Sequence, residues 1–269
     1  MIRLPLALAL LALPGCATAQ GAASSTGAPA ASFADLADLA LAAPVVAEAT
    51  IRRVTQQRDA PVPAGRVRVY LEADVTAAVR APGPLGPRQG WIWEGSAAAA
   101  RSLKGARVLV FARPLPDRPG LLQLIAPDAQ QPSTPDQLAT VRSIVAEAAL
   151  PGAAPAITGL ARAFFTPGAL PGEGTTQLFL STQGGAPVSM TVRRRPGAQP
   201  SWSLALGDVV GAAAPAPERR TLTWYRLACG LPSSLSADSL PDSAADAERV
   251  RSDYAFVLAS LGPCGRTRA

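Results

Sequence analysis

The sequence contains no histidine, and this absence excludes several kinds of site. Without an imidazole there is no Ser-His-Asp triad and no Cys-His nucleophile pair. Zinc sites that include histidine, the HExxH motif among them, are excluded for the same reason. A catalytic centre in this chain would have to be built from carboxylates, a Ser/Lys pair, tyrosine or arginine. We expect no cofactor and no metal, because no motif for either is present.

Lysine is nearly absent as well, since Lys104 is the only one among 25 basic residues. With 19 acidic residues, the formal net charge is +6, and arginine carries the positive charge. Two interpretations stay open: codon composition with a solvated surface, or attraction to an anionic envelope component such as lipopolysaccharide or lipid headgroups. Basic clusters interleaved with aromatics are missing, so we expect no nucleic-acid partner.

The sequence has no apolar run of the roughly 20 residues that a transmembrane helix needs. A shorter run, Leu4–Leu13, follows Arg3 and is followed by the small-residue segment Pro14–Gln20. This order is typical of an export signal. We therefore expect the mature protein in the periplasm or anchored at the outer membrane.

Two cleavage sites fit this signal. Leu13–Cys16 resembles a bacterial lipobox, in which Cys16 would be lipidated and become the new N-terminus. Ala17–Ala19 is an A-x-A site, which would make residues 1–19 the signal peptide. Residues 20–32 are Gln followed by Gly, Ala, Ser, Thr and Pro only, which predicts a flexible tether. A lipid anchor is the only membrane attachment that we expect.

Both alternatives leave two cysteines, Cys229 and Cys264. An even pair in an oxidising compartment predicts one disulfide. The bridge would close a loop of about 35 residues, worth roughly 3–4 kcal/mol in the chain-entropy model.

Residues 33–150 read as a β-rich domain that ends in a helix. Ser32 is a candidate N-cap for a helix that Pro44 ends, and Asp35 and Asp38 on it are interpreted as solubilising charge. Thr134 followed by proline predicts a second helix. Alternating or short apolar runs predict strands at 45–56, 66–79, 91–93, 107–111 and 121–125.

Residues 156–269 read as an α+β domain, separated from the first by the Pro/Gly-rich segment 151–155. Ser243 caps a predicted C-terminal helix. We predict strands at 157–165, 176–180, 188–194, 201–206 and 221–227. The fold class expected is α+β, with mainly antiparallel sheet in two small units and a few helices.

Three segments carry a resemblance: residues 33–46, 172–180 and 224–232. They resemble segments of uncharacterised exported proteins of sphingomonad-type alphaproteobacteria, for which no activity is known. Separately, the stretch 32–128 is similar to the small β-barrel domains of some exported proteins, which implies a barrel for the first unit and nothing about chemistry.

Few residues are candidates for a site. Glu173 lies between two glycines. This position fits an exposed catalytic acid or ligand-binding group, and it also fits an ordinary turn that leads into a strand. Arg193 begins a run of three arginines. The run would either bind an anion or form the end of a strand with solvated side chains. Trp91 and Trp93 share a strand face, where they would form an aromatic ligand platform or belong to a packed core or a sheet edge.

These observations favour an exported, non-catalytic envelope protein, a binding or structural module for an envelope component or a protein partner. The alternative is a carboxylate-dependent hydrolase of cell-wall or glycan material, with Glu173 as its acid. That enzyme should place Glu173 in a concave site beside a second acid or a tyrosine.

The export signal predicts the N-terminus of the mature protein. Mass spectrometry of protein from its native membrane should find a chain that starts at Cys16, carrying lipid, or at Gln20. A mature chain that still starts at Met1 would contradict export.

Overall fold

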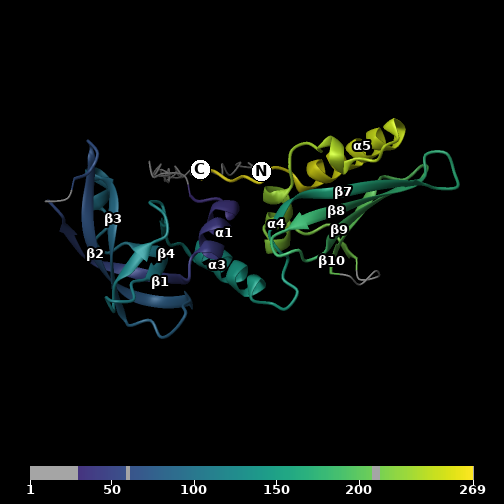
Figure 1. Cartoon of the computed structure of the whole chain (residues 1–269). Helices are drawn as coiled ribbons and strands as arrows, with labels where there is room; N and C mark the ends of the chain where they lie inside the picture. The colour runs from purple at the N-terminus through teal and green to yellow at the C-terminus, as the bar shows by residue number, and fades with distance from the viewer. Residues whose placement is uncertain (1–29, 59–60, 208–212, 269) are drawn as a thin grey trace, which may run out of the picture. The chain divides into compact units, whose positions relative to one another are not determined.

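The computed structural model describes residues 30–58, 61–207 and 213–268. Within these ranges the chain is α+β, with two antiparallel sheets and five α-helices, one of them C-terminal (Figure 1). The expected fold class is thereby confirmed. No helix in the described ranges is both long and apolar enough to cross a membrane.

The first sheet curls into a nearly closed barrel. Its strand order is β3-β2-β1-β4-β5, with β6 paired to β4. A single parallel bridge between Gly90 and Leu121 brings the first and last strands of this order together. Buried side chains such as Ile51, Leu71 and Trp91 fill the interior. The elements are β1 (Val45–Gln56), β2 (Arg66–Arg80), β3 (Arg88–Ser96), α2 (Ala97–Arg101), β4 (Arg107–Pro114), β5 (Leu122–Leu124) and β6 (Gln130–Pro132).

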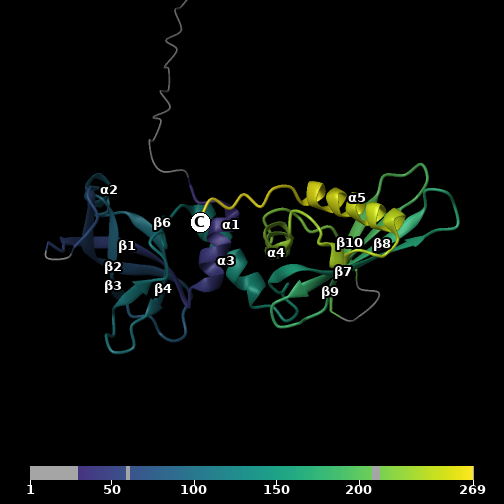
Figure 2. The same cartoon turned by 45° about the horizontal axis from the view of Figure 1, so that its top comes forward.

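The second sheet is an antiparallel meander in the order β11-β10-β9-β8-β7. Its strands are β7 (Ile157–Pro167), β8 (Gly174–Thr182), β9 (Val188–Arg194), β10 (Ser201–Leu206) and β11 (Ala214–Pro215). Val188, Met190 and Val192 alternate toward the core, as the period-two pattern predicts. Helix α5 (Ala244–Leu261) lies over this face in both views (Figures 1 and 2).

Three further helices pack into the same hydrophobic cluster as α5 and the inner face of the second sheet. They are α1 (Phe33–Ala42), α3 (Pro135–Ala148) and α4 (Leu222–Gly230), and a 3₁₀ turn covers Ala237–Ser239. One compact unit runs from Ala31 to Ala269. The predicted domain boundary at 151–155 stays a prediction. The signal peptide, Cys16 and most of the tether lie outside the described residues.

The predicted strand at 221–227 is wrong, because these residues form α4. Thr221 is its N-cap, and the Thr221 hydroxyl accepts a hydrogen bond from the Trp224 amide (3.2 Å). The Trp224 indole donates to the Leu261 carbonyl at the end of α5 (2.9 Å). A short apolar run fits either a buried strand or a buried helix, and here tertiary packing selects the helix.

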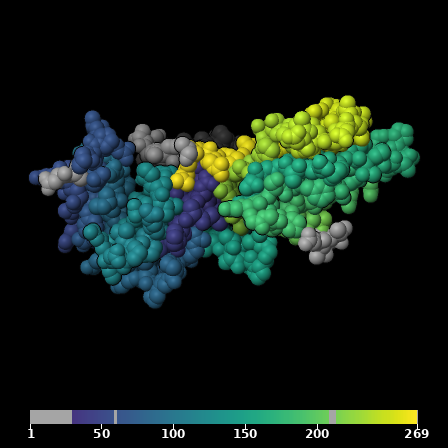
Figure 3. Space-filling model, viewed as in Figure 1, coloured from purple at the N-terminus to yellow at the C-terminus, as the bar shows by residue number. Residues whose placement is uncertain are grey.

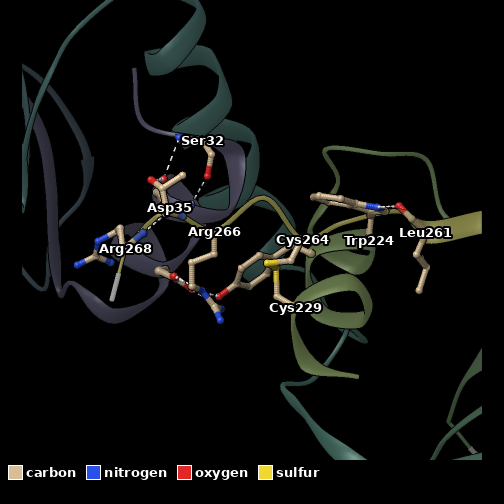
Figure 4. The surroundings of a disulfide bond; sticks show 11 residues. Ser32, Asp35, Trp224, Cys229, Leu261, Cys264, Arg266 and Arg268 are labelled. Atoms are coloured by element: carbon tan, nitrogen blue, oxygen red, sulfur yellow. Dashed lines mark hydrogen bonds and ion pairs between the residues drawn. A yellow bond between two sulfur atoms is a disulfide. The ribbon is translucent and has the colours of Figure 1, made fainter. Parts of the chain in front are cut away.

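Residues 262–268, which we call the C-terminal strap, run from the end of α5 to α1 (Figure 3). The predicted disulfide is present in the strap, because Cys264 is bonded to Cys229 of α4 with a Cα–Cα distance of 4.9 Å. Figure 4 shows the bridge beside the contacts between the strap and α1. The bond therefore fixes the strap to a helix of the hydrophobic cluster.

The interpretation of Asp35 and Asp38 as solubilising charge is wrong. Asp35 is 1% exposed and forms the capping box of α1 together with Ser32. Its carboxylate also accepts hydrogen bonds from the Thr267 amide (2.8 Å), the Thr267 hydroxyl (2.6 Å) and the Arg268 amide (3.0 Å). Asp38 accepts two bonds from the Arg266 guanidinium (2.7 and 2.9 Å). Both carboxylates therefore bind the strap, and Figure 4 shows Asp35 next to Arg268.

This arrangement predicts a pH-dependent stability. Burial alone would raise the pKa of Asp35, but hydrogen bonds from Thr267, Arg268 and Ser32 outweigh it and hold that pKa well below its usual range. The ionised carboxylate therefore stabilises the fold above about pH 4, the pKa of an unfolded aspartate, and this contribution is lost as the pH falls toward the folded-state pKa.

Replacing Asp35 by Asn should lower the free energy of unfolding at pH 7 by about 1–3 kcal/mol. The deficit relative to the wild type should narrow below about pH 4. Urea unfolding at pH 7 and pH 3 measures both effects, with the exposed Asp117→Asn as the matched control. An equal loss in the control, or a deficit that does not change with pH, would contradict this role for Asp35.

Candidate anion-binding site

Glu173 organises the loop between β7 and β8. Its Oε2 accepts hydrogen bonds from the amides of Ala169 (3.1 Å) and Leu170 (3.3 Å). The Glu173 backbone closes the loop from both sides, because its carbonyl accepts from Gly168 (3.0 Å) and its amide donates to Leu170 (3.0 Å). Gly172 has a φ of 84°, which favours glycine at this turn. The carboxylate thus holds the loop in one conformation.

The register of the second sheet places the arginine run beside this loop. Arg194 lies opposite Gly174 and Arg193 lies opposite Thr175 in the β8–β9 pairing. Arg195 follows directly after β9. Two features that are separate in the sequence, Glu173 and the arginine run, therefore line one site.

Arg194 is the fixed member of the run. Its Nε donates to the carboxylate of Asp253 on α5, and its Nη2 donates to the Ser252 hydroxyl (3.3 Å). Asp253 is 1% exposed and also accepts from the Thr176 hydroxyl (2.5 Å). Breaking such a buried pair from one side is costly, so Arg194 anchors the wall of the site to α5.

Two hollows of about 330 and 350 Å³ share Glu173 and Arg194 in their lining. We call them together the arginine hollow; Arg249 of α5 lines one and Arg193 and Arg195 line the other. Within the described ranges, no ion pair uses any of these last three arginines.

The arginine hollow carries excess positive charge. Four arginines less the two carboxylates of Glu173 and Asp253 leave a net charge of +2. The Glu173 carboxylate accepts hydrogen bonds from two loop amides, and the Asp253 carboxylate is buried and paired with Arg194. The guanidinium groups of Arg193, Arg195 and Arg249 are exposed. The site can therefore attract and hold an anion.

The hydrolase alternative needs a second acid or a tyrosine beside Glu173. Among the described residues that line the arginine hollow, Glu173 is the only carboxylate and there is no tyrosine. General acid–base hydrolysis needs one group to donate a proton and one to accept it. The surroundings of Glu173 fit electrostatic binding better than this chemistry.

The two candidate tryptophans lie on the barrel side of the molecule. Trp91 is 1% exposed, and its indole donates to Gln130 of β6 (2.7 Å). The Trp93 ring lies over Gly95, where an added Cβ would meet it at 2.0 Å. Trp91 belongs to the barrel core, and Trp93 is partly buried and packs against that core. This burial leaves no open face of Trp91 for a ligand.

Sequence reasoning did not anticipate two polar positions. Arg249 is one of two arginines on α5, and only the fold brings it to the arginine hollow. Glu48 is 3% exposed in β1 and accepts hydrogen bonds from Ser133 (2.6 Å), Thr76 (2.8 Å) and Arg107 (2.8 Å). Burial acts to raise the pKa of Glu48, but these bonds lower it. All three partners lie within the barrel region, so Glu48 reads as structural.

Comparisons with known proteins assign the chain to no family. No protein-family model matches the chain, and no curated protein is significantly similar to it.

The loop geometry predicts how Glu173 responds to substitution. Glu173→Gln should change the free energy of unfolding by no more than about 0.5 kcal/mol, because the amide oxygen can still accept from Ala169 and Leu170. Glu173→Ala should cost about 1 kcal/mol, because both bonds are lost. Urea unfolding of the two variants beside the wild type measures the difference. An equal loss in both would contradict the loop-closing role.

Proposed function

We propose that the chain is an exported, non-catalytic binding module of the cell envelope, and that the arginine hollow takes an anionic envelope component. One observation carries the binding part of the proposal. Arg249 lines one of the two adjoining hollows, Arg193 and Arg195 line the other, and Arg194 lines both. No carboxylate of the described residues pairs with Arg193, Arg195 or Arg249.

The chemistry of arginine suggests the class of ligand. A guanidinium presents a planar fork of donors that matches phosphate and carboxylate oxygens, and it stays charged at every physiological pH. Each hollow, at about 330–350 Å³, is at the lower end of the volumes of small-molecule sites. A phosphate-bearing headgroup or the phosphorylated sugar of a lipopolysaccharide fits these requirements.

The location in the envelope rests on the sequence and on the disulfide. The segment from Arg3 to Gln20 has the order of an export signal. A Cys229–Cys264 bond persists in an oxidising compartment. The resemblance to exported proteins of sphingomonad-type bacteria points the same way. Lipidation at Cys16 would tie the chain to a membrane, where an anionic headgroup is close to hand.

Co-sedimentation with lipid vesicles tests the proposal. The chain starting at Gln20 should bind phosphatidylglycerol vesicles or lipopolysaccharide micelles, and it should not bind phosphatidylcholine vesicles. Preference for one of the two anionic lipids identifies the source of the phosphate. Changing Arg193, Arg195 and Arg249 together to Gln should weaken binding roughly 100-fold, at about 1 kcal/mol for each arginine near an anionic surface.

A second triple variant controls for net charge. Arg58, Arg101 and Arg142 are exposed and do not line the hollow. Changing these three to Gln removes the same charge and should weaken binding by less than about tenfold. Equal losses in the two triple variants would show general charge attraction in place of a site. Turnover of peptidoglycan by the wild type that Glu173→Gln abolishes would instead favour the hydrolase.

A further inference from the structure

The outer face of the second sheet, the face turned away from α5, carries an exposed pair of aromatic rings (Figure 1). Phe164 on β7 and Phe179 on β8 are 45% and 40% exposed. Their ring centroids are 6.0 Å apart in an edge-to-face arrangement, and the Arg162 guanidinium lies 5.9 Å from the centroid of the Phe164 ring. Phenylalanine is usually buried, so two exposed neighbours mark a candidate binding surface.

The strand register connects this pair to the arginine hollow. On the outer face, Phe164 lies opposite Gln177, and Gln177 lies opposite Thr191. Arg193 follows two residues after Thr191 and shares its face, because alternate residues of a strand lie on one side of a sheet. Arg193 also lines the hollow of about 350 Å³. The aromatic pair and this part of the arginine hollow therefore belong to one continuous surface.

Sheet geometry gives the distance between the two ends of this surface. Alternate residues on one strand are about 6.7 Å apart, and neighbouring strands are about 4.8 Å apart. Arg193 lies two strands away from Phe164 and one such step along the strand, which places their Cα atoms about 12 Å apart. A lone phosphate held by Arg193 does not reach the Phe164 ring, whereas a phosphorylated disaccharide spans both.

The charge of the outer face favours an anionic ligand. Arg162 and Arg193 are both exposed on it. Among the described residues of the outer face on β7 to β10, none is acidic. The rings therefore lie on a positive surface, and a ligand that covers them gains from carrying negative charge.

The polarity of the outer face favours a sugar over a purely apolar ligand. The polar side chains of Gln177 and Thr191 lie between the Phe164 ring and Arg193. An acyl chain laid along this path would cover these polar groups without hydrogen-bonding to them, which is costly. A pyranose ring has a flat face of C–H groups that stacks on an aromatic ring, and its hydroxyls bond to amide and hydroxyl groups. A sugar that carries phosphate is complementary to this surface in both polarity and charge.

We propose that the outer face binds the sugar rings of a phosphorylated glycan whose phosphate occupies the arginine hollow. Arg193 and Arg195 hold the phosphate, one sugar ring stacks on Phe164, and Gln177 and Thr191 bond to the hydroxyls between them. The assignment rests on the proposed function, because the hollow must take an anion. It goes further by naming a glycan, such as the sugar part of a lipopolysaccharide, in place of a phospholipid headgroup.

Three soluble probes measure what the sugar contributes, by isothermal titration calorimetry on the chain that starts at Gln20. They are a diglucosamine bisphosphate, inorganic pyrophosphate and the unphosphorylated disaccharide. The bisphosphate should bind about tenfold more tightly than pyrophosphate, because contact with an aromatic ring adds to the ion pairing. Equal affinity for the unphosphorylated disaccharide would contradict a phosphate anchor and overturn the assignment.

Two substitutions isolate the ring of Phe164. Phe164→Leu keeps an apolar side chain without the flat ring, and Phe164→Ala removes the side chain beyond Cβ. Both should weaken binding of the bisphosphate about tenfold and leave the affinity for pyrophosphate within about twofold. Leu206→Ala is the matched control, because Leu206 is 41% exposed on β10 and follows the inward alternation of Trp202 and Leu204. It should change neither affinity, and circular dichroism checks that each variant folds.

Side-chain NMR separates stacking from charge attraction. In the chain labelled with ¹³C-phenylalanine, the ring signals of Phe164 and Phe179 should shift when the bisphosphate binds and should stay in place with pyrophosphate. The Nε–Hε signals of Arg193 and Arg195 should shift with both probes.

The outcomes distinguish failure of the glycan assignment from failure of the proposed function. If pyrophosphate shifts Arg193 and Arg195 but the bisphosphate binds no more tightly, or leaves the Phe164 and Phe179 rings unmoved, the glycan assignment is wrong and the anion site stands. If no probe shifts these arginines, both proposals are wrong. A ligand-free dimer that Phe164→Ala dissociates in sedimentation velocity would also overturn the assignment, because a second copy of the chain would then cover the rings.

Discussion

The carboxylate of Asp35 holds together parts of the chain that are more than 230 residues apart. It caps its own helix through Ser32 and at the same time accepts the amides of Thr267 and Arg268. The disulfide fixes the same strap to α4 at Cys264. Two attachments of different chemistry therefore hold the C-terminal end of the chain against α1 and α4, two helices of the hydrophobic cluster.

Local patterns were sufficient to predict most elements of the fold. The strand at 45–56, the helix capped by Thr134 and the helix capped by Ser243 have the expected positions. These segments succeed because their caps and apolar periodicity agree with the packing they enter. The segment 221–227 failed because a short apolar run has no period of its own to separate strand from helix.

Non-local polar contacts were beyond the reach of the sequence. Asp35 looked like solubilising charge because its partners lie at the far end of the chain. Glu173 and Arg193 were both singled out, but only the β8–β9 register shows that they line one hollow. No sequence pattern around Arg249 marks it as a site residue, and it reaches the arginine hollow only because α5 packs over the second sheet. The spacing of residues along the chain does not predict such strand register or helix packing.

Hollows in the two halves of the molecule differ in the side chains that line them. The arginine hollow offers charge on side chains whose backbone is held by β8, β9 and α5. The hollow beside β5 is lined mostly by apolar side chains.

The central claim is that the arginine hollow is a specific anion site, and arginine side-chain NMR tests it most directly. Inorganic pyrophosphate is titrated into the ¹⁵N-labelled chain while the Nε–Hε signals are followed. Arg193, Arg195 and Arg249 should shift together and saturate with one dissociation constant, whereas the exposed Arg101 and Arg142 should barely move. Shifts of similar size in all five arginines that never saturate would contradict the site.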